Sequence, residues 1–304
     1  MTVIGSSDLA QMLSMADAID ALEKAFSEVD LPETPPRMHV ETADGTLLVM
    51  PAHGRRGAGV KIVTVAPANP ARGLPLIHGA YALFAPGTLR LEAIIDGAAL
   101  TGLRTAAVSG LATRHLARPS ARALVIFGAG AQANSHLDAM LAVRPIESVT
   151  VVSRTAERAE ALAARAVAIG LEGSVGDASA VAGADIVCTC TTSTEPLFDG
   201  DLLQPGTHVN AIGAFQPHAR EVDDNTVLRS RVVVENRAAA LEEAGDLIIP
   251  IATGVVTDGH IAADLPEVVG GGRVRRADTD ITLFKSVGLA LEDLAVARAA
   301  AGAG

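Results

Sequence analysis

The stretch "ARALVIFGAGAQANSHLDAML", residues 121–141, joins an apolar run, a glycine-rich turn and a helical pattern. Its turn has the spacing G-x-G-x-x-A, which by itself is a weak signal. The strand-like run before it and the helix after it are the context of a dinucleotide site. There, glycine permits a tight bend close to a pyrophosphate, and the helix N-terminus offers N–H groups and a favourable dipole. The turn residues expected to contact the cofactor are Gly128, Gly130, Ala131, Gln132 and Ala133.

Strand-like and helix-like segments continue to alternate after this turn. "ESVTVVSRTAERAEALAARAVAIG" repeats the order strand then helix, and "ADIVCTCTTS", "GTHVNAIG" and "RVVVEN" are further candidates for buried strands. Alternating strands and helices imply right-handed crossovers and a parallel sheet. We therefore predict the α/β class, with a Rossmann dinucleotide-binding domain over residues 118–286.

The first hundred residues have a different pattern. Helical apolar spacing predicts one helix over residues 8–29, with Ser6 or Ser7 as its N-cap. Short β-like runs divided by prolines and an Asp-Gly turn follow, and they predict a mostly antiparallel sheet. The C-terminal "ITLFKSVGLALEDLAVARAA" is interpreted as a helix that packs back on this region. The prediction is a discontinuous α+β domain made of residues 1–117 and 287–304.

Composition limits the classes of function. The chain has 304 residues and a formal net charge of −11, which argues against nucleic acid because phosphate binding needs clustered Lys and Arg. The N-terminus lacks the pattern of a signal peptide and no apolar run approaches the ~20 residues of a membrane helix, so we expect a cytoplasmic protein. Cys188 and Cys190 suit neither a disulfide framework nor a zinc site, and no metal is expected.

The end of the second strand of the predicted Rossmann domain indicates which dinucleotide is preferred. NAD-preferring sites usually place Asp or Glu there to bind the ribose 2′-hydroxyl. This chain has Ser153, Arg154 and Thr155, with Arg158 one turn further on. Two hydroxyls and a guanidinium suit a 2′-phosphate, and no carboxylate repels it. We predict NADPH, with NADH as the weaker alternative.

Three cations lie in the first part of the chain: Arg37 after "PETPP", Lys61 in "GAGVKIVTVAP" and Arg104 in "TGLRTAAVSG". Lys61 interrupts an apolar strand, where lysine is rare unless it has a partner. Taken singly, each is also typical of an ordinary surface or snorkelling charge. Together they resemble a carboxylate clamp, because a guanidinium matches a carboxylate and a nearby lysine adds a point charge.

With these residues in place, the chain resembles the ornithine cyclodeaminase/mu-crystallin family. The matching stretches are "GVKIVTVAPANPARGLP", "DGAALTGLRTAAVSGLATRHLA", "GAGAQANSH", "NAIGAFQPHARE" and "LFKSVGLALED", in the family's order and over nearly the whole chain. The resemblance implies a substrate and dimerisation domain, a Rossmann domain, a cleft between them, and a homodimer. It implies that Arg37, Lys61 and Arg104 contact the substrate. Further cofactor contacts implied by it are Thr105, near the phosphates, and Thr191, Asn210, Ala211, Ile212, Gly213 and Ser286, on the nicotinamide side.

One position separates this chain from the family's cyclodeaminases, which carry an aspartate in the loop where Phe215 stands. Ala219 replaces a lysine of those enzymes, and Leu76 stands where threonine is common. Without the aspartate, oxidation and ammonia loss lack a proton acceptor. Reduction of an iminium needs mainly orientation and exclusion of water, and Phe215 would be a wall against an apolar ring. His218 and Glu221 are interpreted as loop structure.

The chain is therefore most similar to the family's imine reductases, which act on Δ1-pyrroline-2-carboxylate and Δ1-piperideine-2-carboxylate. In the expected mechanism, Arg37 and Arg104 bind the carboxylate, and Lys61 neutralises charge and protonates the ring nitrogen. His78 is an alternative proton donor and substrate contact. Three other functions stay open: an alanine-type amino-acid dehydrogenase, an ornithine cyclodeaminase, and a non-catalytic mu-crystallin-like protein that binds NADPH and a ligand.

Overall fold

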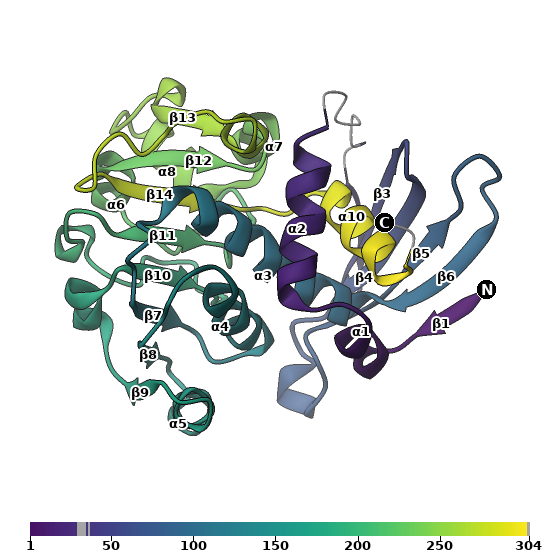
Figure 1. The fold of residues 1–304 in the computed structure, drawn as a ribbon, viewed down its shortest axis with the longest axis horizontal. Coiled ribbons are helices and arrows are strands. Elements are labelled where there is room, and N and C mark those ends of the chain that lie inside the picture. Colours follow the sequence, from purple (N-terminus) through teal and green to yellow (C-terminus); the bar gives the residue numbers. More distant parts are fainter. Residues whose placement is uncertain (29–34, 36, 303–304) are drawn as a thin grey trace. The chain divides into compact units, whose positions relative to one another are not determined.

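The computed structural model describes residues 1–28, 35 and 37–302. The chain forms two compact units, one of residues 1–108 with 288–304 and one of residues 109–287 (Figure 1). The division falls inside helix α3 (Gly97–Leu116), whereas the domain boundary expected from sequence lies just after that helix. Each unit has its own sheet.

The first unit is built on a six-stranded sheet. In sheet order its strands are β1 (Thr2–Ile4), β6 (Leu91–Asp96), β5 (Ile77–Phe84), β4 (Gly57–Val65), β3 (Gly45–Gly54) and β2 (Met38–Thr42). β1 runs parallel to β6, and every other pair is antiparallel. The prediction of a mostly antiparallel sheet is confirmed, with the short strand β1 as an addition.

The prediction that the segment 8–29 is largely helical is confirmed over its described residues, but two helices occupy it instead of one. α1 spans Ser6–Met12 and α2 spans Met15–Phe26, and residue 29 lies outside the described residues. Gly5 is the N-cap of α1. Ser14 starts α2, where its hydroxyl accepts a hydrogen bond from the Asp17 amide at 3.1 Å. A serine that satisfies an orphan N–H favours a new helix start over a continuous helix.

The C-terminal prediction is also wrong in part. Ile281–Lys285 form strand β14, and only Ala290–Ala300 form the last helix, α10. An apolar run as short as "ITLF" does not distinguish a buried strand from a buried helix by periodicity. Helix α10 does pack back on the first unit as expected, against α2 and strands β3, β4 and β5. The buried side chains of this core include Ile19, Leu22, Leu48, Met50, Val63, Tyr81, Leu83, Ile95 and Leu294.

The second unit is built on an eight-stranded sheet, and all its strand pairs are parallel. In sheet order the strands are β13 (Ile261–Asp264), β12 (Ser230–Val234), β14, β11 (His208–Ala211), β10 (Ile186–Thr189), β7 (Ala123–Phe127), β8 (Ser148–Val152) and β9 (Glu172–Val175). The order β9-β8-β7-β10-β11 is that of a doubly wound dinucleotide-binding sheet. The predicted Rossmann fold is confirmed.

Helices connect these strands (Figure 1). They are α4 (Ala131–Val143), α5 (Ala156–Ala168), α6 (Asp224–Arg229), α7 (Arg237–Glu243), α8 (Gly245–Ala252) and α9 (Leu265–Val269). α4 packs on β7 and β10, α5 on β8 and β9, and α6 on β12 and β14. Strands β10, β11 and β14 are buried along their whole length, which is typical of parallel strands covered on both faces. Cys188 is packed inside β10, as predicted.

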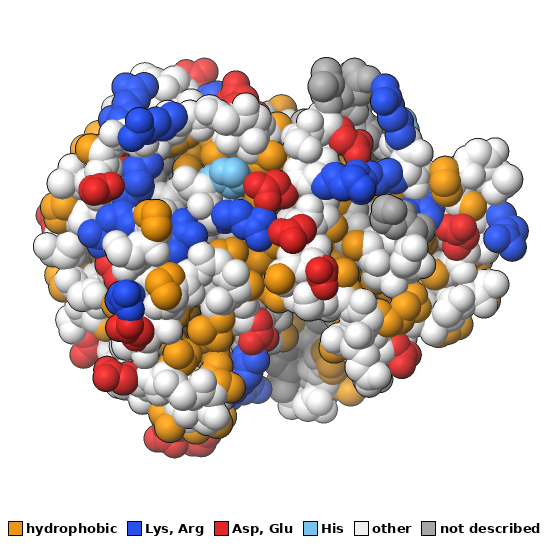
Figure 2. Space-filling view, viewed as in Figure 1, with side chains coloured by type: hydrophobic (Ala, Val, Ile, Leu, Met, Phe, Trp, Pro, Cys, Tyr) orange, Lys and Arg blue, Asp and Glu red, His pale blue; other side chains and the backbone are white. Residues whose placement is uncertain are grey.

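Figure 2 shows acidic, basic and apolar side chains interspersed over one face of the molecule. None of the helices in the described part of the chain is both long and apolar enough to span a membrane. Ligands of open parallel sheets bind at the carboxyl ends of the strands, where the strand order reverses. In the second unit this point lies between β7 and β10, so a ligand is expected to contact the residues that follow these two strands.

Candidate active site

The glycine turn after β7 has the geometry that a dinucleotide needs. Gly128 has a φ of +101°, and a Cβ there would lie 2.5 Å from the Cys190 carbonyl oxygen. Only glycine fits without strain, because L side chains rarely adopt this conformation. At Gly130, no described atom lies within 4 Å of the position a Cβ would take, so its side of the backbone is open. Gly130 is also the N-cap of α4 and has no side chain to cap the helix. The residues therefore fit a pyrophosphate group at this helix end.

The residues after β8 fit the phosphate prediction in type and in exposure. Ser153 accepts a hydrogen bond from the Thr155 amide at 3.2 Å, which shapes the turn into α5. Arg154 and Arg158 are both exposed. Within the described ranges, neither guanidinium forms an ion pair with an acidic residue. Both therefore remain available to an anionic ligand at this end of the sheet.

The carboxyl ends of β10 and β11 are joined by one buried carboxylate, that of Glu221. Its two oxygens accept four hydrogen bonds, from the Thr189 hydroxyl at 2.7 Å, the Thr191 amide and hydroxyl at 2.8 and 2.6 Å, and the Gly213 amide at 2.7 Å. Burial raises the pKa of the Glu221 carboxyl, and the charge of Lys285 with the threonine hydrogen bonds opposes this. Glu221 thus fixes two positions, Thr191 and Gly213, that are expected near the nicotinamide.

A buried ion pair holds the loop that carries Phe215. Lys285 and Asp246 lie 2.7 Å apart and are both fully buried. The Lys285 ammonium also donates to the Ala214 carbonyl at 2.5 Å, and Asp246 accepts from the Glu221 amide at 2.7 Å. The loop is anchored at both ends, while the Phe215 side chain is 37 % exposed. An apolar ring held out from an anchored loop is suited to contact a ligand.

The other residues expected on the nicotinamide side are buried. The Asn210 amide donates to the Thr113 hydroxyl at 2.9 Å, and the Ser286 hydroxyl donates to the Glu235 carboxylate at 2.5 Å. Ala211 is the last residue of β11, and Ile212 follows it. Both polar side chains are engaged inside the unit, so their cofactor contacts stay predictions and would involve the backbone.

In the first unit, the structure brings Lys61 and Arg104 to the same carboxylate. Lys61 is 2 % exposed, and its ammonium lies 3.0 and 2.8 Å from the two oxygens of Asp293. The Arg104 Nε atom lies 3.5 Å from Asp293, and its Nη1 atom donates to Glu292 at 2.7 Å. The predicted pair of cations is therefore a real cluster, formed by β4, α3 and α10.

Arg37 completes this cluster through the backbone. Its Nη2 atom donates to the Gly288 carbonyl at 2.8 Å, and Gly288 packs so closely on the Arg104 guanidinium that a Cβ there would clash. Thr105, next to Arg104, is buried. Arg37 and Arg104 thus both lie against Gly288, and Lys61 and Arg104 both lie against Asp293. Guanidinium and ammonium groups gathered in this way suit a ligand with a carboxylate.

Burial and the nearby charge of Arg104 together lower the pKa of Lys61 to about 8, against the opposing effects of Asp293 and Glu292. The amine is therefore mostly protonated at neutral pH and can give up its proton more easily than an ordinary lysine. His78 lies on β5, where Thr64 pairs with His78 and Lys61 pairs with Tyr81. Since side chains alternate along a strand, His78 lies on the opposite face of the sheet from Lys61. This geometry favours Lys61 over His78 as the proton donor.

A model of the ornithine cyclodeaminase/mu-crystallin family matches residues 2–301 of the chain. The chain belongs to this family. A Δ1-pyrroline-2-carboxylate reductase of Bacillus cereus is 38 % identical over 98 % of this chain and 95 % of the relative. The family prediction made from the sequence is confirmed.

Solved structures of family members have the same fold. A Thermococcus litoralis Δ1-pyrroline-2-carboxylate reductase in complex with NADH and L-proline has a TM-score of 0.95 and 36 % identity, covering 100 % of this chain and 97 % of that one. An archaeal alanine dehydrogenase dimer with bound NAD has a TM-score of 0.94 and 31 % identity, covering 100 % of this chain and 95 % of that one. Oxidoreductases that use a nicotinamide dinucleotide thus share the whole architecture.

Glu292 and Asp293 were not predicted to belong to the site, although they lie in the stretch "LFKSVGLALED" that resembles the family. Helix α10 is buried along almost its whole length, and both acids are fully buried. An acidic residue is rarely buried without a partner. Two adjacent acids in a mostly apolar, buried helix were therefore the signal that this helix meets cations of the first unit.

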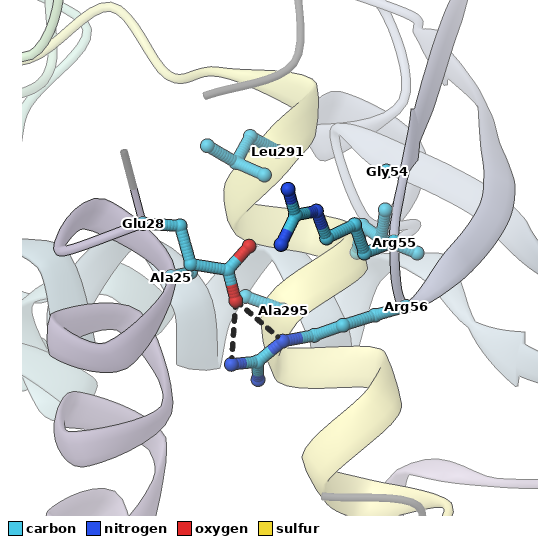
Figure 3. Close-up of a pocket in the computed structure, with 8 residues that line it drawn as sticks. Ala25, Glu28, Gly54, Arg55, Arg56, Leu291 and Ala295 are labelled. Carbon is cyan, nitrogen blue, oxygen red and sulfur yellow. Dashed lines mark hydrogen bonds and ion pairs between the residues drawn. The ribbon is translucent and has the colours of Figure 1, made fainter. Parts of the chain in front are cut away.

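The first unit also has a small pocket, which Figure 3 shows. Its lining residues are Ala25, Glu28, Gly54, Arg55, Arg56, Leu291, Leu294 and Ala295. Glu28 forms an ion pair with Arg56 at 2.7 Å across it. No residue predicted for substrate or cofactor lines this pocket. In the described part of the chain, no group of three His, Cys, Asp or Glu side chains is arranged to hold a metal ion.

Proposed function

We propose that this family member reduces cyclic imino carboxylates with NADPH, converting Δ1-pyrroline-2-carboxylate to proline and Δ1-piperideine-2-carboxylate to pipecolate. The observation that carries the proposal is the buried cluster in which Lys61 and Arg104 contact the same Asp293 carboxylate, with Arg37 donating to the carbonyl of Gly288, which packs on Arg104. The reductases of B. cereus and T. litoralis support it, since the second is in complex with L-proline.

In the proposed reaction, Arg37 and Arg104 bind the substrate carboxylate, because guanidinium groups match its two oxygens. When bound, the dinucleotide supplies a hydride to the imine carbon. Lys61 gives a proton to the ring nitrogen, so that the C=N bond becomes a CH–NH unit, and it regains the proton from water. The lowered pKa of Lys61, about 8, suits a group that must be protonated at rest and release its proton on demand.

Phe215 distinguishes this reaction from the cyclodeaminase reaction. A phenyl ring cannot accept a proton, so the oxidation of an amino acid and the loss of ammonia have no acceptor at this position. An exposed apolar ring instead suits the methylene groups of a cyclic substrate. The alanine dehydrogenase relative favours a second candidate, the reductive amination of a linear keto acid.

Turnover of the two substrate types tests the proposal. We expect kcat/KM for Δ1-pyrroline-2-carboxylate with NADPH to exceed that for pyruvate with ammonia by at least ~100-fold, because only the ring matches Phe215 and enters as a ready-made imine. Phe215→Ala should raise KM for the cyclic imine and leave the pyruvate rate nearly unchanged. NADPH oxidation at 340 nm measures both. Turnover only with pyruvate and ammonia would establish the dehydrogenase, and NADPH binding without turnover would establish a binding protein.

The proposed preference for NADPH rests on this chain's own residues. The structural relatives are complexes with NADH or NAD. Here, Ser153 and Thr155 provide hydroxyls at the end of β8, and Arg154 and Arg158 provide exposed guanidinium groups. A ribose 2′-phosphate binds to such groups, whereas a ribose 2′-hydroxyl is usually bound by a carboxylate.

We further propose that the first unit mediates dimerisation through the sheet face opposite Lys61. The register places Val49, Val60, Ile62, Ala82 and Ile94 together on that face. Their side chains are partly exposed, and Ile62 is 45 % exposed. A second copy of the chain is the proposed partner, because the alanine dehydrogenase of the same fold is a dimer.

Ile62→Lys tests this face. A lysine buried in an interface without a partner costs several kcal/mol. The Kd of the dimer should therefore rise by more than ~100-fold, and the protein should be monomeric at about 10 µM. Ile169→Lys, at a residue of the second unit that is 51 % exposed, is the matched control. Light scattering measures the mass. A variant at Ile62 that stays dimeric would place the interface elsewhere.

A further inference from the structure

We propose that Asp293 is a positioning residue for the reaction: from the last helix, it holds Lys61 and Arg104 together in the arrangement that receives the substrate. This inference rests on the proposed function, since it assigns a role within the same site. It extends the site to a helix that the sequence separates from Lys61 by 232 residues.

The geometry shows that one carboxylate serves both cations. The Lys61 ammonium lies 3.0 Å from Oδ1 and 2.8 Å from Oδ2 of Asp293, and the Arg104 Nε atom lies 3.5 Å from the same Oδ1. An ammonium has three N–H donors, and one hydrogen bond to Asp293 leaves donors for a ligand. The Asp293 carboxylate therefore orients the Lys61 ammonium while leaving part of it available.

Glu292, the neighbour of Asp293 on α10, has a narrower role. It contacts Arg104 at 2.7 Å, and its charge raises the pKa of Lys61 less than does the charge of Asp293, which lies directly against the Lys61 ammonium. Successive helical residues point in directions about 100° apart, so the two acids approach the cluster from different sides. Asp293 is thus the carboxylate that couples the two cations, and Glu292 is the matched comparison within the same helix.

A structural role alone accounts poorly for Asp293. Replacement of a buried ion pair by apolar residues of similar volume is often neutral or stabilising, so a buried pair is weak support for a purely structural function. Lys61 and Asp293 are almost completely buried. Retaining two charges there is understandable if the ammonium must be protonated and directed at a ligand.

The charged groups that face Lys61 determine how its protonation responds to a change at Asp293. The charged ones are Arg104 on α3 and Asp293 and Glu292 on α10, and the titratable Tyr81 lies opposite Lys61 on the neighbouring strand β5. Burial and Arg104 lower the pKa of Lys61, and Asp293 is the largest influence that raises it. Burial and the charge of Asp293 keep the pKa of the Tyr81 hydroxyl above its usual value, so Tyr81 stays neutral. Removal of the Asp293 charge therefore lowers the pKa of Lys61.

Asp293→Asn keeps the size of the side chain and removes its charge. Since the reaction needs protonated Lys61, kcat/KM falls as pH rises through the Lys61 pKa, which is about 8 in the native protein. In the variant this fall should begin at a pH lower by at least ~0.5 unit, with kcat/KM at pH 8 reduced at least ~10-fold. The Kd of NADPH should stay within ~2-fold, because the cofactor turn belongs to the second unit. Rates of cyclic imine reduction from pH 6 to 10 measure these effects.

Glu292→Gln is the control for a general loss of structure. It should lower kcat/KM through Arg104, with a much smaller displacement of the pH profile, because Glu292 is the weakest of the influences that raise the Lys61 pKa. An unchanged profile in Asp293→Asn, or equal displacements in both variants, would overturn the proposal. If Asp293→Asn does not fold, Asp293→Glu restores the charge with a longer side chain, and it should recover the native profile but not the native kcat.

Direct titration separates this inference from the proposed function. The chain has only three lysines, Lys24, Lys61 and Lys285. Protein labelled with ¹³Cε-lysine therefore gives three assignable NMR signals, and Lys61→Met identifies the one from Lys61. The Lys61 signal should titrate at lower pH in Asp293→Asn than in the native protein. If the native enzyme reduces no cyclic imine but this shift occurs, the substrate assignment fails and the positioning role stands; an unmoved signal would refute the positioning role.

Discussion

Arg104→Gln should lower kcat/KM for Δ1-pyrroline-2-carboxylate by about 10²–10⁴-fold, while the Kd of NADPH changes less than ~3-fold. A hydrogen bond to a charged group contributes about 1.5–3 kcal/mol, and the loss of a two-bond fork therefore corresponds to a rate change of that order. Arg104 is almost fully buried and held by Glu292 and Asp293, so it is already oriented before the substrate binds. Steady-state rates and fluorescence titration with NADPH measure the two quantities.

Two variants separate loss of binding from loss of folding. Arg104→Gln breaks the buried Arg104–Glu292 ion pair, and removing one partner of a buried pair costs about 3–5 kcal/mol of stability. The double variant Arg104→Gln/Glu292→Gln should recover most of that stability without recovering activity. Arg104→Lys keeps the charge and loses the planar fork, so it should retain intermediate activity. Full activity in the double variant would show that Arg104 does not bind the substrate.

Arg154→Asp should reverse the cofactor preference. Loss of the guanidinium removes a charge-assisted contact to the 2′-phosphate, and the new carboxylate repels that phosphate while it can accept a hydrogen bond from a ribose 2′-hydroxyl. We expect kcat/KM for NADPH to fall about 100-fold and that for NADH to change less than ~5-fold or to rise, which corresponds to about 3 kcal/mol in discrimination. Initial rates with each cofactor at saturating imine measure the ratio.

The control for this substitution is Arg90→Asp, at an exposed arginine of the first unit. It makes the same change in net charge at a site remote in sequence from the nucleotide turn, and it should leave the ratio of NADPH to NADH unchanged. If both variants lost the preference for NADPH to a similar extent, the effect would come from long-range electrostatics and not from a contact between Arg154 and the 2′-phosphate. An unchanged ratio of kcat/KM for NADPH to that for NADH in Arg154→Asp would mean that the residues at the end of β8 do not bind the 2′-phosphate.

Much of the second unit could be predicted because its signals are local. Strand β7, Gly128 at positive φ and the start of α4 follow one another within a few residues, and each is a direct consequence of the residue types there. The alternation of apolar strands and helices likewise required a parallel sheet. By contrast, β14 was interpreted as part of a helix, because five buried residues fit either structure and only hydrogen bonding to β11 and β12 decides between them.

By itself, the sequence determined the family, the dinucleotide turn and which cations are proposed to bind the substrate, since these depend on residue types at short spacing. It could not reveal how the cations are held. Glu292 and Asp293 lie 188 and 232 residues from Arg104 and Lys61, and only the packing of α10 against the first sheet brings them into contact. The role of Glu221 was missed in the same way. The four groups that donate hydrogen bonds to it lie at the ends of β10 and β11, and only the fold brings them together. Buried charges must find partners, but the partners are chosen by tertiary contacts across the chain.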